Sequence, residues 1–203
     1  MQIRPPQFIK DLMPMLVWNF PHEPNSVFIT FDDGPTPQIT PWVVDKLNEY
    51  NAKATFFCLG KNVEQHPAEF QYILQNGHTV GNHSYSHQRG LTMSVGSYVQ
   101  DVDLADSFIH SHLYRPPYGI ILPAQARMLG ERYKIIMWDV ISFDYKKNAN
   151  YKTTCFNNVK NNIKAGSIVC FHDSMKSAKN MKYTLPKTLD LIVEKGWTAK
   201  GIE

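Results

Sequence analysis

Acidic and histidine side chains recur at spacings that suit metal-assisted chemistry. Asp32 and Asp33 are adjacent, and two like charges side by side are stabilised by a cation. His83 and His87 form an H-x3-H pair, which allows both imidazoles to bind one ion. One carboxylate with two imidazoles leaves coordination positions open, which is typical of a catalytic rather than a structural metal site. Zinc is the expected ion, with cobalt or nickel as alternatives.

Two further groups suit hydrolysis. Arg115 precedes Pro116, and a guanidinium can clamp a carboxylate while prolines hold the next backbone amide toward an oxyanion. A protonated His172 would supply a general acid, and Asp144 could orient it and raise its pKa. Structural explanations also exist: residues 32–35 form a good turn sequence, the arginine could be exposed in a rigid turn, and His172 could be a core histidine.

Short strands that alternate with helices must position these side chains. We expect strands at residues 27–31, 54–58, 78–82, 113–115, 133–140, 167–171 and 197–199, and helices at 39–50, 67–76, 95–110, from 123 onward, and at 185–194. This alternation predicts parallel strands in a closed or nearly closed α/β barrel, with a doubly wound open sheet as the alternative. Catalytic groups of such barrels lie at the carboxyl ends of strands. The residues expected to converge there are Asp32, Asp33, His83, Arg115, Asp139 and His172.

Composition narrows the classes of protein. Lys and Arg total 21 against 18 Asp and Glu. The chain has no block of consecutive basic residues of the kind that binds nucleic acid, so we expect no nucleic-acid partner. No apolar window reaches the roughly 18 residues of a membrane span, and the three cysteines are expected as free thiols. The N-terminus lacks the features of a signal peptide, which favours a cytoplasmic location. We expect a monomer with a lead segment, residues 1–26, packed on one catalytic domain, residues 27–203.

Three motifs together resemble the polysaccharide deacetylase family, carbohydrate esterase family four. The motifs are Thr30-Phe31-Asp32-Asp33-Gly34-Pro35, His83-Ser84-Tyr85-Ser86-His87 and Arg115-Pro116-Pro117-Tyr118-Gly119. The similarity extends from about residue 27 to residue 172 and includes 54–57 and 77–82. It implies a distorted (β/α)7 barrel, similar to a TIM barrel. The implied substrates are acetylated carbohydrates: N-acetylglucosamine polymers, peptidoglycan glycan strands or, less often, O-acetylated xylan.

The resemblance also implies a role for each motif residue. Asp32 would be the catalytic base, Arg115 would hold it, and His172 would be the general acid. The metal ligands would be Asp33, His83 and His87. The residues expected to bind the oxyanion or the substrate are Tyr118, through its backbone N–H, and Pro116, Trp138 and Tyr145.

Three positions depart from the family pattern. Many relatives have aspartate where Ile141 stands, tryptophan where Tyr145 stands and leucine where Cys170 stands. The altered Tyr145 concerns the wall of the acetyl pocket, so substrate preference can differ. Three other functions compete with N-deacetylation: an O-acetyl esterase of the xylan type, a metal-bearing carbohydrate-binding protein without turnover, and a non-haem iron oxygenase.

Overall fold

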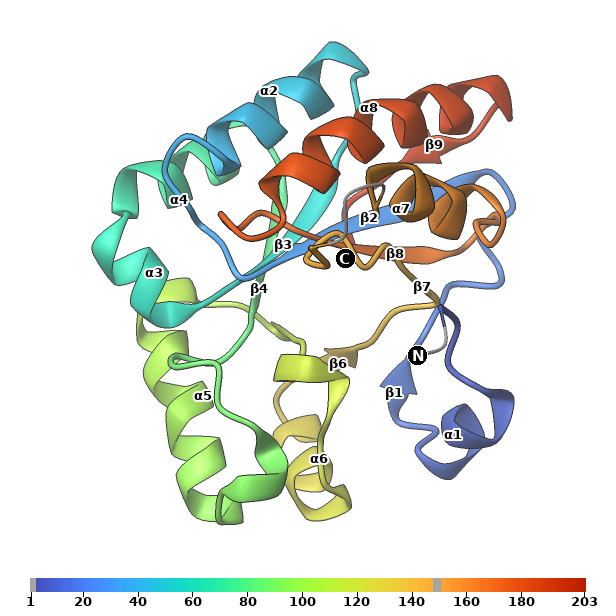
Figure 1. The fold of residues 1–203 in the computed structure, drawn as a ribbon. Helices are drawn as coiled ribbons and strands as arrows, with labels where there is room; N and C mark the ends of the chain where they lie inside the picture. Colours follow the sequence, from blue (N-terminus) through green and yellow to red (C-terminus); the bar gives the residue numbers. More distant parts are fainter. Residues whose placement is uncertain (1–2, 148–150) are drawn as a thin grey trace.

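Parallel strands form the centre of the molecule (Figure 1). The computed structural model describes residues 3–147 and 151–203. The strands in these residues are β1 (Leu16–Val17), β2 (Ser26–Asp32), β3 (Ala54–Cys58), β4 (Thr79–Asn82), β5 (Leu113–Tyr114), β6 (Lys134–Ile136), β7 (Val140–Ile141), β8 (Ile168–His172) and β9 (Thr198–Ala199). They follow the order β1-β6-β5-β4-β3-β2-β8-β7, and β9 pairs with the start of β2. This curled parallel sheet confirms the predicted fold class, a distorted barrel.

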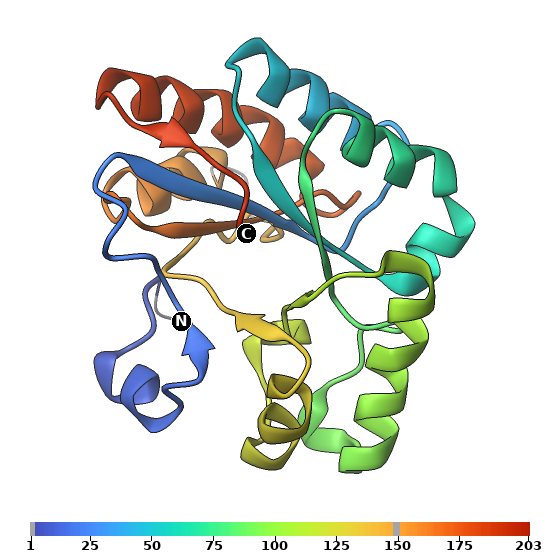
Figure 2. The ribbon, with the colours of Figure 1, turned by 180° about the vertical axis from the view of Figure 1, so that it is seen from behind.

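Helices cover the outer side of the sheet, as Figures 1 and 2 show from opposite sides. They are α1 (Gln7–Leu12), α2 (Thr40–Glu49), α3 (Gly60–Gln65), α4 (Pro67–Gln75), α5 (Val95–Ile109), α6 (Pro123–Gly130), α7 (Tyr151–Lys160) and α8 (Ala178–Glu194). Among the described residues, no helix is both long and apolar enough to cross a membrane.

Strand β2 is the central element that positions the site. All seven of its residues are buried, and it lies between β3 and β8. On its outer side Phe31 stacks between Phe56 and Phe171, with ring centroids 5.0 and 5.9 Å away. The parallel register sets Asp32 beside His172 at the carboxyl ends of β2 and β8. Hydrophobic packing of the outer side therefore fixes the place of the polar residues at the strand ends.

The N-terminal segment fills the space between β6 and β7 (Figure 1). Strands β1 and β7 are the two edges of the sheet order, and β1 pairs with β6. The Met137 amide donates to the Val17 carbonyl at 2.7 Å, and the Ile141 amide donates to the Ile3 carbonyl at 3.2 Å. Residues near the start of the chain thus provide backbone partners on both sides of this space.

Two predicted elements were wrong. The strand predicted at 133–140 is two strands, because after Ile136 the chain exchanges its neighbour: the Met137 amide bonds to β1, whereas the Asp139 amide donates to the Ile168 carbonyl on β8. The helix predicted to start at 185 begins seven residues earlier, at Ala178, and continues through Pro186.

Candidate active site

One cavity of about 200 Å³ lies at the carboxyl ends of the strands. Its lining consists of Asp32, Asp33, His83, His87, Tyr118, Trp138, Ile141, Tyr145, His172 and Lys176. A larger hollow of about 690 Å³ lies at the opposite end, beside β9, and its described lining holds neither histidine nor aspartate. The smaller cavity, which holds the histidines and aspartates predicted from the sequence, is therefore the candidate active site.

Asp33, His83 and His87 face one another in this cavity. Asp33 Oδ1 lies 3.3 Å from His87 Nε2 and 3.8 Å from His83 Nε2, and the three potential ligand atoms all lie within 4.8 Å of one another. Ligand atoms about 2.0–2.2 Å from a tetrahedral ion are separated by roughly 3.3–3.6 Å, so this spacing fits a single divalent ion. The structure thus brings together the three residues predicted as ligands.

The surroundings of the two histidines suit metal binding. His83 Nδ1 lies 2.8 Å from the Arg115 carbonyl, which favours the tautomer that leaves Nε2 without a proton. Burial and the neighbouring His83 lower the pKa of His87 to about 4, so its imidazole is neutral at physiological pH. Both Nε2 atoms therefore offer a lone pair toward Asp33.

Three residues of the cavity have left-handed backbone conformations. The φ angles are 80° at Asp33, 58° at His87 and 61° at Tyr118. Such conformations cost non-glycine residues about 1–3 kcal/mol each and persist where the surrounding structure enforces them. Their concentration around one cavity supports its assignment as the functional site.

Asp32 lies beside this triad and is bound to Arg115. Arg115 Nη1 donates to Asp32 Oδ1 at 2.7 Å, and both side chains are buried. Burial alone would raise the pKa of Asp32, but the charge of Arg115, together with that of His172, holds it below its ordinary value. Asp32 is thus a carboxylate at neutral pH, as a proton acceptor requires.

Arg115 is held rigidly by the interior of the barrel. It donates to Thr30 Oγ1 at 2.7 Å and to the backbone carbonyls of Ile136 and Met137. Its guanidinium carbon also lies 4.1 Å from the centroid of the Phe57 ring. These contacts satisfy a fully buried cation and explain why it is not exposed in a turn.

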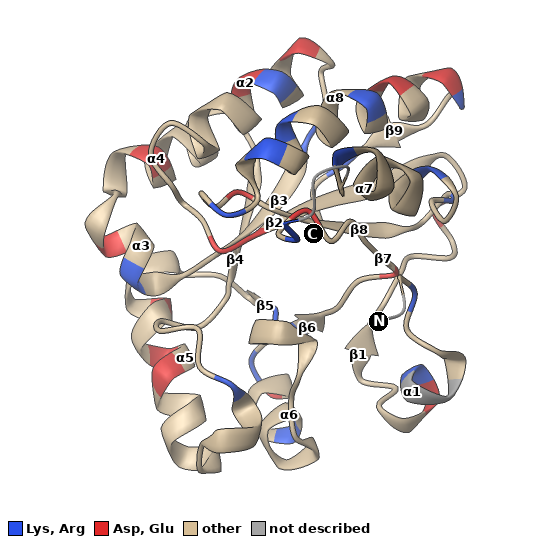
Figure 3. Ribbon diagram, in the orientation of Figure 1, with Lys and Arg blue, Asp and Glu red and all other residues tan. Residues whose placement is uncertain are grey.

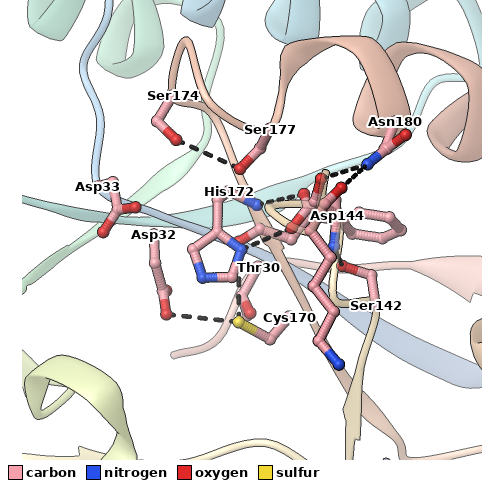
Figure 4. A network of polar contacts seen from close by, with 12 residues as sticks. Thr30, Asp32, Asp33, Ser142, Asp144, Cys170, His172, Ser174, Ser177 and Asn180 are labelled. Atoms are coloured by element: carbon pink, nitrogen blue, oxygen red, sulfur yellow. Dashed lines mark hydrogen bonds and ion pairs between the residues drawn. The ribbon is translucent and has the colours of Figure 1, made fainter. Parts of the chain in front are cut away.

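His172 and Asp144 form the second ion pair of the site (Figure 4). Asp144 Oδ1 lies 2.7 Å from His172 Nδ1, and Asp144 Oδ2 accepts the His172 backbone amide at 2.8 Å. Burial alone would lower the pKa of His172, but Asp144 raises it to about 9 overall. The imidazole is therefore protonated at neutral pH, with Nε2 left as the remaining donor.

Cys170 contacts Asp32 from β8, which the sequence did not indicate. Its thiol donates to Asp32 Oδ2 at 3.4 Å (Figure 4). The potential ligand atoms of Asp32, Cys170 and His172 also lie within 4.8 Å of one another. They are less suited to an ion than the first triad, because burial holds the thiol pKa well above its ordinary value and both other side chains already have charged partners.

Aromatic side chains form the walls of the cavity. Tyr145 meets the His172 ring edge-on, with centroids 5.0 Å apart, and Tyr118 lies 4.6 Å from the His87 ring. Trp138 lies against Gly119, where a Cβ atom would come within 2.3 Å of the indole. Pro116 is buried and lies outside the cavity lining.

The expectation that Asp139 joins this group was wrong. Its carboxylate binds Arg4 and Lys10, each at 3.2 Å, and accepts the Ser167 hydroxyl at 2.8 Å. The break between β6 and β7 turns Asp139 toward the N-terminal segment instead of the cavity. It connects residues near the start of the chain to the barrel.

Comparisons with known proteins agree with these motifs. The sequence profile of a family described as polysaccharide deacetylase matches residues 20–132. The chain belongs to this family. Two Bacillus cereus relatives, both named peptidoglycan-N-acetylglucosamine deacetylase, are 35% and 32% identical to it. The first alignment covers 76% of this chain and 58% of the relative. The second covers 93% of this chain and 92% of the relative.

A solved structure has the same fold. It is a peptidoglycan N-acetylglucosamine deacetylase in complex with 4-naphthalen-1-yl-N-oxidanyl-benzamide, and it is 30% identical to this family member. The TM-score is 0.87, and the match covers 93% of this chain and 91% of the other. The resemblance and the fold class expected from the motifs are thereby confirmed.

Proposed function

We propose that the chain is a metal-dependent hydrolase that removes N-acetyl groups from glycans containing N-acetylglucosamine. One observation carries the proposal: the Asp33, His83 and His87 triad shares a cavity with Asp32, which is bound to Arg115, and with His172, which is bound to Asp144. The names of the relatives support the acetyl group and the sugar. Residues 27–203 would form the catalytic domain, with residues 1–26 as its packed lead segment.

Each side chain has a task in this proposal. A divalent ion, with zinc favoured, would be held by Asp33, His83 and His87 and would supply Lewis acidity toward water and the acetyl carbonyl. Asp32 accepts the proton of the attacking water, and Arg115 holds the carboxylate in place. The amide N–H of Tyr118 donates to the oxyanion.

His172 completes the reaction in this proposal. Its protonated Nε2 donates the proton that the departing sugar amine needs, while Asp144 stabilises the imidazolium through Nδ1. Acetate and the free amine are the products. Asp32 and His172 thus act as base and acid because their partners push the two pKa values in opposite directions.

Acetate release tests the proposal directly. The purified protein is incubated with N-acetylglucosamine oligomers and with O-acetylated xylan oligomers, with and without a chelator, and then with zinc, cobalt or nickel restored. We expect release from the N-acetylated oligomers, loss with chelator and recovery with metal. Turnover that the chelator leaves unchanged would contradict the metal site, and turnover of acetylxylan alone would favour the O-acetyl esterase.

Two substitutions separate the base from the metal ligands. Asp32→Asn is expected to lower kcat by about 10²–10⁴-fold while the bound metal is retained. His83→Ala is expected to remove both activity and metal. Asp103→Asn is the control, because Asp103 is exposed and pairs with Arg132 on the surface. Full activity in Asp32→Asn would refute the assignment of the base.

A further inference from the structure

The small net charge of the chain conceals a strongly basic interval. Residues 146–187 contain nine lysines and a single acidic residue, Asp173, which is buried. The interval therefore carries +8 while the whole chain carries +3, so the other residues together carry −5. The lysines are spread along the interval and form no long run of adjacent basic residues. Whether their charges lie close together therefore depends on the fold.

Helices α7 and α8 carry five of these nine lysines. The two helices pack against each other, and Figure 3 shows basic positions along α8 from its first turns, with acidic positions only toward its far end. We call six of the lysines the lysine face. They are Lys146, Lys152, Lys176, Lys179, Lys182 and Lys187.

Aromatic rings lie beside several members of the lysine face. The Tyr183 ring has Lys152 and Lys187 each 5.1 Å from its centroid. The Trp42 ring has Lys182 at 5.0 Å. Such contacts hold an ammonium group along the surface without neutralising it.

The lysine face lacks acidic partners. In the described part of the chain, the lysines that form ion pairs are Lys10, Lys46 and Lys200, all outside it. Like charges gathered without counter-charges repel one another and destabilise the folded state. A bound polyanion would remove that cost, whereas a neutral polymer would not.

The lysine face begins at the catalytic cavity. Lys176 lines the cavity, and its ammonium lies 5.2 Å from the ring of Tyr145, which in turn contacts His172. Beyond Lys176 the face continues along α8, which rises about 14 Å from Ala178 to Lys187 at 1.5 Å per residue. A polymer with one sugar in the cavity could thus run directly over α8.

We propose that the lysine face binds anionic groups of the substrate itself, so that the preferred substrate is a glycan carrying carboxylate or phosphate groups along its length. This rests on the proposed deacetylase function and adds the chemical class of the polymer. Lys176 contacts the sugars nearest the cavity, and Lys179, Lys182 and Lys187 contact groups farther along.

Charge-matched triple variants test the proposal. Lys179→Gln, Lys182→Gln and Lys187→Gln together remove three of the six charges of the lysine face without touching the cavity. Lys134→Gln, Lys195→Gln and Lys200→Gln remove the same charge from the opposite end of the barrel, where β6 and β9 begin. Thermal unfolding of both variants confirms that each is folded before kinetics are measured.

Two oligomers with the same acetyl group provide the readout. One is a neutral N-acetylglucosamine oligomer, and in the other alternate sugars carry a carboxylate. For the anionic oligomer at low ionic strength, we expect the face variant to raise KM by about tenfold with kcat unchanged, and high salt to abolish the difference. Neither the neutral oligomer nor the control variant should show this effect. Equal changes for both oligomers, or none, would overturn the proposal.

Competition and binding complete the design. Poly(glycerol phosphate) and polyglutamate as competitors distinguish phosphate from carboxylate recognition. If the face variant loses affinity for a DNA oligonucleotide but keeps the KM of the anionic glycan, the surface serves nucleic acid and the proposal fails. Binding of a labelled anionic oligomer to metal-loaded Asp32→Asn protein is measured separately. If the unmodified protein releases no acetate, the deacetylase function is refuted. Binding of the labelled anionic oligomer still decides the role of the lysine face in that case.

Discussion

Asp32 and His172 lie opposite each other in the parallel register of β2 and β8. Asp32 is deprotonated at neutral pH, whereas His172 is protonated. Arg115 keeps the first ionised, and Asp144 keeps the second protonated, although burial opposes both charged forms. Each partner is itself fully buried: Arg115 also donates to the Met137 carbonyl, and the Asp144 carboxylate also accepts the His172 backbone amide. The difference in protonation state therefore comes from the partners and not from the position of the two groups within the barrel.

The pH dependence of catalysis should report the His172 and Asp144 pair. The pKa of His172 is raised to about 9, so the imidazole loses its proton as pH rises through about 9. The stabilisation of the folded state by the protonated His172 is complete below pH 6.5 and is lost over the same rise. A bound divalent ion repels the imidazolium, so the basic limb of kcat/KM is expected at or below pH 9. In Asp144→Asn the limb should move to lower pH. A limb that stays in place in pH-rate profiles would contradict the role of His172.

Residue types at strand ends made most of the site predictable. Asp32, His83 and His172 are polar residues that follow apolar strands, so their side chains had to meet at one edge of a parallel sheet. Cys170 and Lys176 carry no such signal. A thiol inside a strand is usually core, and a lysine in a loop is usually solvated, so only the fold reveals their neighbours.

At the scale of elements, the segment between β6 and β7 has a structural task that stability measurements can check. Asp139→Asn removes the charge that binds Arg4 and Lys10. Since Arg4 is partly exposed, we expect a loss of about 1–3 kcal/mol in the free energy of unfolding by urea. The kcat/KM should stay within about twofold, because Asp139 lies outside the cavity.

The exposed pair of Asp103 and Arg132 provides the control for this measurement. Asp103→Asn should change stability by less than about 0.5 kcal/mol. A loss of activity in Asp139→Asn with unchanged stability would instead place Asp139 in the catalytic machinery.

The break within residues 133–140 shows what sequence patterns leave out. Apolar residues stand on both sides of Asp139, so the run reads as one strand. In the fold, the Met137 amide bonds to β1, whereas the Asp139 amide, two residues later, bonds to β8. No local pattern encodes a change of neighbour, because it depends on a segment more than a hundred residues earlier in the chain.

At the scale of the whole molecule, metal binding should be visible as thermal stability. A ligand that binds only the folded state adds about 2.7 kcal/mol at a hundredfold excess over its Kd. For a chain of this size that corresponds to a rise in Tm of roughly 5–10 °C. Calorimetry with zinc should show this rise in the unmodified protein and in His112→Ala, whose histidine is exposed, but not in His87→Ala. An equal rise in all three would locate the ion elsewhere.

The general architecture followed from the alternation of strands and helices, since parallel strands need crossover connections. The contribution of residues 3–17 to the sheet was not visible in the same way. Strand β1 has two residues, too few for a periodic pattern, and its partner β6 is distant in the chain. Short elements of this kind are specified by tertiary contacts and not by local propensity.

The pairing of β1 with β6 joins Leu16 to Ile135. During synthesis, residues 16–17 leave the ribosome long before their partners exist, so this edge waits unpaired while the rest of the sheet assembles. Closing so long a loop is entropically costly, and contacts of such separation form late. The seam beside Trp138 and Ile141 should therefore be the last part of the barrel to close and the first to open, which amide hydrogen exchange would register as early labelling of residues 137–141.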